Sequence, residues 1–138
     1  MALSIEDKLE LHELAGRYGD IIDDRNWSAL DTVFTEDAIF EVVALVTMQG
    51  LPDIKRYMAE DGRHPLAHLI TNIHVEERGD SVRLLSRGIF PISSDHGGAG
   101  HTVFYGSYYD EVCITSKGWR ISHRVFSARR QANANANQ

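Results

Sequence analysis

One segment of the sequence reads RYGDIIDDRNW, residues 17–27. Its first six residues continue an apolar pattern that begins at Ile5 and recurs at the spacing of one helix face. The next four residues are polar, so we expect the helix to end between Ile22 and Trp27. The pattern therefore predicts a long N-terminal helix of about 18 residues, followed by a short polar break.

Capping and turn residues support two further helices beside this first one. Ser4 and Asp7 form a variant of the capping box at the start of the long helix. Asn26 is placed to cap a second, short helix over residues 27–34. Pro52 follows a glycine and opens a third helix that extends to about Glu60.

β-branched and aromatic residues dominate most of the remaining chain and predict strands. The predicted strands cover residues 38–43, 66–77, 81–92, 101–115 and 118–129. Short, turn-rich segments separate the last four, so we expect these strands to pair as antiparallel neighbours. Helices followed by such a sheet indicate an α+β fold, with the sheet wrapped around the first helix. Residues 1–130 then form one domain, and the low-complexity tail, residues 131–138, is predicted to be disordered.

Composition excludes several classes of protein. The 138 residues carry a net charge of -6, which argues against a general nucleic-acid binder. Cys113 is the single cysteine, so neither an intramolecular disulfide nor a cysteine-based zinc site is expected. No apolar run approaches the roughly 20 residues of a membrane helix. The first residues lack a basic segment and an apolar signal core, so we expect a cytoplasmic protein.

The chain contains seven histidines, and His68 lies in the most informative context. In a regular strand it would share one face with Ile70, Asn72 and His74. Such a histidine is commonly a hydrogen-bonded core residue, and a carboxylate such as Asp23 commonly caps a helix. Together they allow a second interpretation, in which the carboxylate orients an imidazole that acts as a general base.

A metal site is not predicted. His64 and His68 are four residues apart, but Pro65 interrupts any helix that would align them. His96 and His101 are five apart, beside the glycine-rich segment 93–100. That segment is interpreted as a hairpin connection, with a lid over a cavity as the functional alternative.

Four motifs occur in a characteristic order: RYGDIIDDRNW, FTEDAIF (34–40), HLITN (68–72) and GWRISHR (118–124). In this order the chain resembles the SnoaL-like branch of the nuclear transport factor 2-like superfamily. The resemblance extends from about Ile5 to Arg129. It implies a cone-shaped α+β barrel, in which a curved antiparallel sheet surrounds the long helix and an apolar pocket.

The resemblance to the scytalone dehydratase-like branch also implies site residues. The catalytic residues would be Asp23, His68 and Tyr18, and the substrate-binding residues would be Arg124, Tyr105, Asn72 and Phe40. Arg124 has a cross-strand ion pair as its alternative role. Strand alternation places Tyr105 and Tyr108 on opposite faces, and Tyr105 is the predicted pocket residue, with Tyr108 and His101 left as alternatives.

Two functions fit these observations. The first is a cofactor-independent lyase or isomerase that acts on a small apolar, polyketide- or steroid-like substrate through an Asp-His dyad. Dehydration, isomerisation and cyclisation remain open. The second is a non-catalytic ligand-binding or assembly domain with the same pocket. In both cases the expected partners are a small molecule and further copies of this chain, as a dimer or trimer, with no nucleic acid, membrane, metal or cofactor.

Overall fold

The computed structural model describes residues 2–93 and 101–131, with the His101 side chain excluded. The elements are α1 (Ile5–Asp23), the 3-10 helix η1 (Trp27–Thr32), β1 (Phe34–Val42), β2 (Val46–Gln49), α2 (Leu51–Glu60), β3 (Leu69–Arg78), β4 (Ser81–Ser93), β5 (His101–Thr115) and β6 (Gly118–Arg129). The segment 93–100 was predicted to be a hairpin connection, with a lid as the alternative, and it lies outside the described residues from position 94 on. The predicted tail, residues 131–138, lies outside them from position 132 on.

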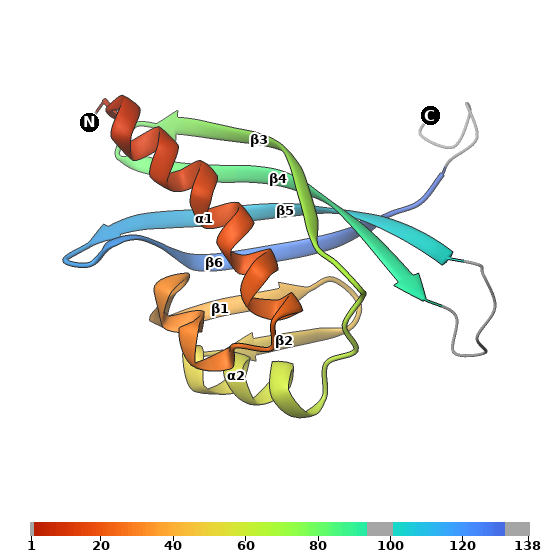
Figure 1. Cartoon of the computed structure of the whole chain (residues 1–138). Coiled ribbons are helices and arrows are strands. Elements are labelled where there is room, and N and C mark those ends of the chain that lie inside the picture. Colours follow the sequence, from red (N-terminus) through yellow and green to blue (C-terminus); the bar gives the residue numbers. More distant parts are fainter. Residues whose placement is uncertain (1, 94–100, 132–138) are drawn as a thin grey trace.

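Six strands form one curved, unclosed sheet in the order β2-β1-β6-β5-β4-β3 (Figure 1). Strands β3 to β6 form the predicted antiparallel meander. The sheet is mixed, however, because β1 runs parallel to β6, with Phe40 opposite Arg124. Strand β2 was not predicted from the sequence. Its hairpin turn contains Ala44 at a φ of 63° instead of the glycine or asparagine that usually marks such a turn.

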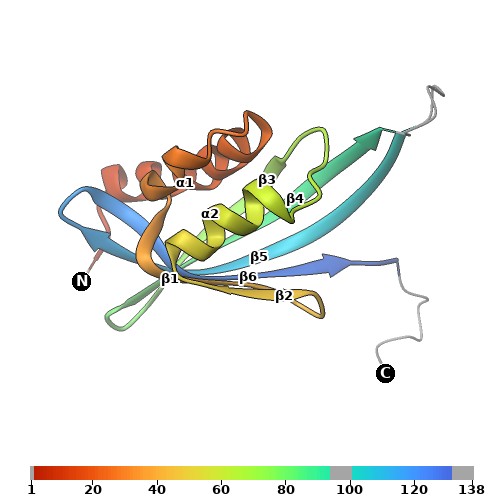
Figure 2. The same cartoon turned by 90° about the horizontal axis from the view of Figure 1, so that it is seen from below.

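Both α-helices lie on the same side of the sheet (Figure 2). Helix α1 buries Leu11, Leu14, Tyr18 and Ile22, as its apolar spacing predicted. The capping box at Ser4 is confirmed. In the part of the chain that the structure describes, no helix is both long and apolar enough to span a membrane.

The second helix differs from the prediction. It is a six-residue 3-10 helix, and β1 begins directly after it, at Phe34. The side chain of Asn26 makes no capping bond to the helix backbone. Instead, its Oδ1 accepts a hydrogen bond from Ser28 Oγ at 3.1 Å. Because 3-10 helices are tight and short, this element serves as a connector between α1 and the sheet.

A bulge in β3 changes which side chains face the core. The register shifts between Thr71 and His74, and Asn72 has a φ of 50°. Ile70 packs against the core, but after the bulge Ile73 does so. The prediction that Asn72 shares one face with His68 and Ile70 is therefore wrong, because the extra residue reverses the alternation.

Helix α1 comes very close to the start of β3 at Gly19. A Cβ at this position would stand 2.9 Å from the Cβ of His68 and 3.0 Å from the carbonyl oxygen of His68. At Gly16, one turn earlier, a Cβ would meet nothing within 4 Å. The glycine at position 19 thus allows the close contact between α1 and β3.

This contrast yields a matched test. Gly19→Ala should destabilise the fold by about 1–3 kcal/mol, because backbone atoms must move to admit the methyl group. Gly16→Ala should stabilise it by about 0.5–1 kcal/mol, because alanine favours the helix. Urea unfolding of both variants measures these changes. Equal effects of the same sign would contradict the close approach.

Candidate active site

A cavity of about 380 Å³ lies between the two α-helices and the inner face of the sheet. Its walls are mainly aromatic and aliphatic: Tyr18, Phe40, Val42, Leu45, Met48, Tyr57, Met58, Phe90, Phe104, Tyr108 and Phe126. The predicted pocket residue Phe40 is among them. Polar groups enter the wall at His68 and along the segment from Asp61 to Pro65. An apolar cavity with a few polar groups is typical of small-molecule sites.

His68 lines this cavity and forms a close polar contact with Asp23. Oδ1 of Asp23 lies 2.7 Å from Nδ1 of His68. Oδ2 of the same carboxylate accepts the backbone N–H of His68 at 2.9 Å. The carboxylate therefore holds both the ring and the main chain. Because Nδ1 faces a carboxylate, it carries the hydrogen of the neutral ring, and Nε2 is left as the basic nitrogen.

The surroundings keep His68 in its neutral form. Its side chain is 7% exposed and that of Asp23 is 22% exposed. Burial lowers the pKa of His68, and the hydrogen bond and charge of Asp23 oppose this shift. The net pKa lies below the ordinary value of 6.5, so the imidazole is unprotonated at neutral pH.

Tyr18 comes from α1, about one turn before Asp23, and packs edge-on against His68 with ring centroids 5.7 Å apart. It lines the cavity and is almost fully buried. Burial raises the pKa of Tyr18 to about 12, although Arg124 opposes the shift. The phenol therefore stays protonated and can donate a hydrogen bond.

Arg124 is paired behind the cavity wall. Its Nε and Nη2 donate to the two carboxylate oxygens of Asp110, each at 2.8 Å, and the arginine is 1% exposed. The guanidinium carbon lies 4.3 Å from the ring centre of Tyr18 and 4.1 Å from that of Tyr108. Arg124 is absent from the cavity lining, so the cross-strand ion pair is the role that the geometry gives it.

Burial affects both members of this pair. It raises the pKa of Asp110, while Arg124 opposes that shift. Burial also disfavours the charged form of Arg124, but Asp110 more than compensates and the pKa of Arg124 is raised. Within the described residues, Nη1 of Arg124 has no hydrogen-bond partner. The two tyrosine rings therefore lie against a cation whose Nη1 group donates no hydrogen bond to the described residues.

Two of the predicted substrate-binding residues, Tyr105 and Asn72, do not line the cavity. Tyr105 is 51% exposed, on the sheet face opposite the helices, and Asn72 is exposed at the bulge. Tyr108 lines the cavity in place of Tyr105, beside Tyr18. Alternation had already grouped Tyr108 with Asp110, which the structure confirms, but the sequence did not show which group faces inward. The side chain of His101 lies outside the described set.

His64 also lines the cavity. From the sequence, the role considered for this residue was that of a metal ligand. Its Nε2 lies 2.8 Å from the carbonyl oxygen of Met58, and its ring packs against Trp27. Across residues 2–93 and 101–131, no three His, Cys, Asp or Glu side chains gather closely enough to hold a metal ion. His96 is not among the described residues.

The buried ion pair leads to a stability prediction. Asp110→Asn should lower the free energy of unfolding by about 3–5 kcal/mol, because it leaves Arg124 buried without a counter-charge. Arg56→Met removes an ion-paired arginine whose side chain is 48% exposed, so it should cost about 1 kcal/mol or less. Urea unfolding compares the two. A small, equal loss would contradict the importance of the buried pair.

Comparison with known proteins identifies the family and the fold of this chain. Residues 3–125 match the SnoaL-like domain family. An uncharacterized protein of Mycobacterium tuberculosis is 36% identical over 127 residues, which cover 88% of this chain and 84% of that protein.

Two solved structures share the fold. An NTF2-like protein with a cystatin-like fold from Novosphingobium aromaticivorans has a TM-score of 0.79 at 23% identity, covering 96% of this chain and 87% of the other. Hexachlorocyclohexane dehydrochlorinase from Novosphingobium barchaimii has a TM-score of 0.74 at 16% identity, covering 96% of each chain. These likenesses concern the fold alone. With its matched domain, mixed curved sheet and N-terminal helix, the chain belongs to the SnoaL-like family and has the NTF2-like cone fold.

Proposed function

We propose that this protein is a cofactor-independent lyase or isomerase in which His68 is the general base. The observation that carries the proposal is the 2.7 Å contact between Asp23 and His68 at the wall of an apolar cavity. A general base must be unprotonated and correctly oriented. His68 is neutral, and the Asp23 carboxylate holds its Nδ1, so Nε2 is the nitrogen that can accept a proton. The carboxylate orients the ring and stabilises the cation that forms when Nε2 accepts a proton.

The chemistry begins at a carbon next to a carbonyl group. Nε2 of His68 takes a proton from that carbon, and the C–H electron pair moves to form an enolate. Tyr18 and Tyr108 line the cavity beside each other, and Tyr18 packs against His68, so these phenols are the proposed hydrogen-bond donors to the enolate oxygen. Return of the proton to another carbon gives isomerisation, whereas loss of a leaving group gives elimination.

The proposed substrate is a small, largely apolar ketone, cyclic or polycyclic, of the polyketide or steroid type. The aromatic wall supports this choice, since Phe90 and Phe104 stack at a centroid distance of 4.7 Å beside the cavity. Self-association as a dimer or trimer belongs to the same proposal. The exposed Leu69, Tyr105 and Tyr109 on the open sheet face support it. A cytoplasmic location remains a prediction.

Proton exchange tests the dyad without knowledge of the natural substrate. A panel of cyclic ketones that includes 1-indanone is incubated with the protein in D₂O, and loss of the α-proton signal is followed by NMR. His68→Gln should slow exchange at least about 100-fold, because it removes the base. Asp23→Asn should slow it at least about 10-fold, because the ring loses its orientation and its counter-charge.

The matched control is His12→Gln, an exposed histidine on α1. This variant should exchange at the rate of the unmodified protein. Binding of the ketones without any exchange would overturn the proposal and favour the ligand-binding domain. Equal rates in the His68 and His12 variants would remove His68 from the mechanism.

The pH dependence gives a separate check. The kcat/KM for exchange should rise with pH through a midpoint below 6.5 and then stay level, because the active His68 is neutral and its pKa is lowered. No loss is expected near pH 10, since the pKa of Tyr18 is raised to about 12. Asp23→Asn should move the midpoint to lower pH, because the carboxylate that raises the pKa is gone. A midpoint above 6.5 would contradict this assignment.

A further inference from the structure

A second imidazole lines the same cavity, and its hydrogen bond determines its tautomer. His64 lies in the segment between α2 and β3, four residues before His68. Its Nε2 is 2.8 Å from the carbonyl oxygen of Met58. A carbonyl oxygen only accepts hydrogen bonds, so Nε2 carries the hydrogen. Nδ1 of the neutral His64 ring is then the nitrogen without a hydrogen.

Three contacts hold this ring in place. Met58 belongs to the last turn of α2, where carbonyl groups lack partners within the helix, so His64 completes the helix end. The indole of Trp27 packs on the ring with centroids 5.3 Å apart. Gly62 provides the space, because a Cβ there would stand 2.7 Å from Cε1 of His64. The ring is thus positioned by α2, by η1 and by its own segment.

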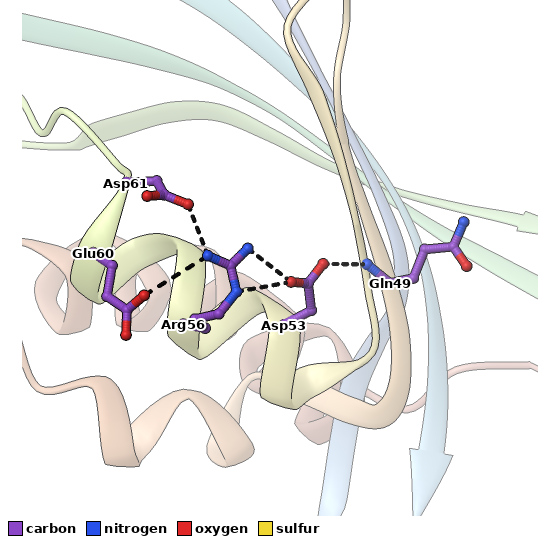
Figure 3. A network of polar contacts seen from close by, with 5 residues as sticks. All are labelled: Gln49, Asp53, Arg56, Glu60 and Asp61. Atoms are coloured by element: carbon purple, nitrogen blue, oxygen red, sulfur yellow. Dashed lines mark hydrogen bonds and ion pairs between the residues drawn. The ribbon is translucent and has the colours of Figure 1, made fainter.

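A polar network anchors the start of this segment (Figure 3). Nη1 of Arg56 lies 2.7 Å from Oδ2 of Asp61, and Nη2 of Arg56 lies 3.0 Å from Asp53. Asp53 in turn accepts the backbone N–H of Gln49 at the end of β2. The segment that carries His64 is therefore tied to α2 and, through it, to the sheet.

Titratable groups on several elements line the cavity together with His64, including Tyr18 on α1 and Tyr108 on β5. Asp61 and Arg63 lie on the same segment as His64, Tyr57 lies on α2, and His68 stands at the start of β3. The carboxylate of Asp61 is already paired with Arg56. His68 is the partner that matters for chemistry, because both imidazoles line one cavity and their hydrogen bonds leave different nitrogens without a hydrogen, Nε2 of His68 and Nδ1 of His64.

We propose that His64 is a general acid which, through Nδ1, protonates the leaving group, so that the reaction is an elimination of water from a β-hydroxy ketone. This inference rests on the proposed function and narrows it. The two histidines differ in the partner behind the ring. The Asp23 carboxylate stands behind His68 and supports the cation that forms there, whereas the neutral carbonyl oxygen of Met58 stands behind His64.

The step balances without a redox partner. Nε2 of His68 takes the α-proton, and the C–H electron pair forms the new carbon–carbon double bond by way of the enolate. The β C–O bond breaks, and its electron pair leaves with the oxygen. Protonated His64 delivers the hydrogen of Nδ1 to that oxygen, so water departs. His68 ends as the cation, His64 ends neutral, and exchange with solvent restores both.

A pair of related probes separates the acid from the base. Exchange of the α-proton of 1-indanone needs only the base, whereas dehydration of 3-hydroxy-1-indanone to indenone needs both groups. His64→Gln retains an amide N–H that can donate to Met58 but has no group that titrates. It should slow dehydration at least about 30-fold more than it slows exchange, within the usual range for a general acid. His12→Gln serves again as the control and should alter neither rate.

Each outcome has a distinct meaning. Equal slowing of both reactions by His64→Gln would assign His64 a structural role and overturn this inference. Exchange without dehydration in the unmodified protein would also overturn it, yet would leave the Asp23–His68 dyad intact. Absence of exchange would remove the proposed function and this inference with it.

An ¹⁵N NMR titration of the histidine rings provides a readout that does not depend on turnover. The neutral ring of His64 should carry its hydrogen on Nε2, and Nδ1 should be the nitrogen that titrates. The neutral ring of His68 should show the opposite tautomer. A hydrogen on Nδ1 of neutral His64 would overturn the assignment of the acid.

Discussion

One carboxylate joins the end of α1 to the start of β3. Oδ1 of Asp23 accepts a hydrogen bond from Nδ1 of His68, and Oδ2 accepts one from the backbone N–H of His68. A single side chain therefore sets both the orientation of the imidazole and the path of the chain into β3. Gly19 permits this contact, because any larger residue would hold the helix away from His68. The position of the cavity between helix and sheet follows from this junction.

A second buried polar contact supports the wall beside the first. The Asp110–Arg124 pair lies between β5 and β6, and the rings of Tyr18 and Tyr108 cover its cation. Because the pair is shielded from water, each charge is stabilised by the opposite charge of its partner and not by solvent. The phenols of Tyr18 and Tyr108, which line the cavity, are thus backed by a fixed charge pair, and the ring of Tyr18 packs against His68.

Sequence patterns predicted the parts of this arrangement that depend on local periodicity. The spacing of apolar residues predicted α1, and turn residues predicted the meander from β3 to β6. Motif order pointed to Asp23 and His68 before their contact was known. Alternation paired Tyr108 with Asp110, but it could not decide which face of β5 is covered, so Tyr105 was chosen wrongly. The bulge at Asn72 left no comparable signal, because a single extra residue does not alter the composition of a strand.

The sequence by itself determined the family, the order of most elements and the residue types that carry chemistry, since these depend on local spacing and on motifs. Only the tertiary structure decided that Arg124 pairs behind the cavity and that Tyr108 faces it. It also decided that His64 shares the cavity with His68. The physical reason is that these contacts join residues on different elements. The packing of α1 and α2 on one face of the curved sheet sets the distances between these residues. No pattern along the chain encodes that packing.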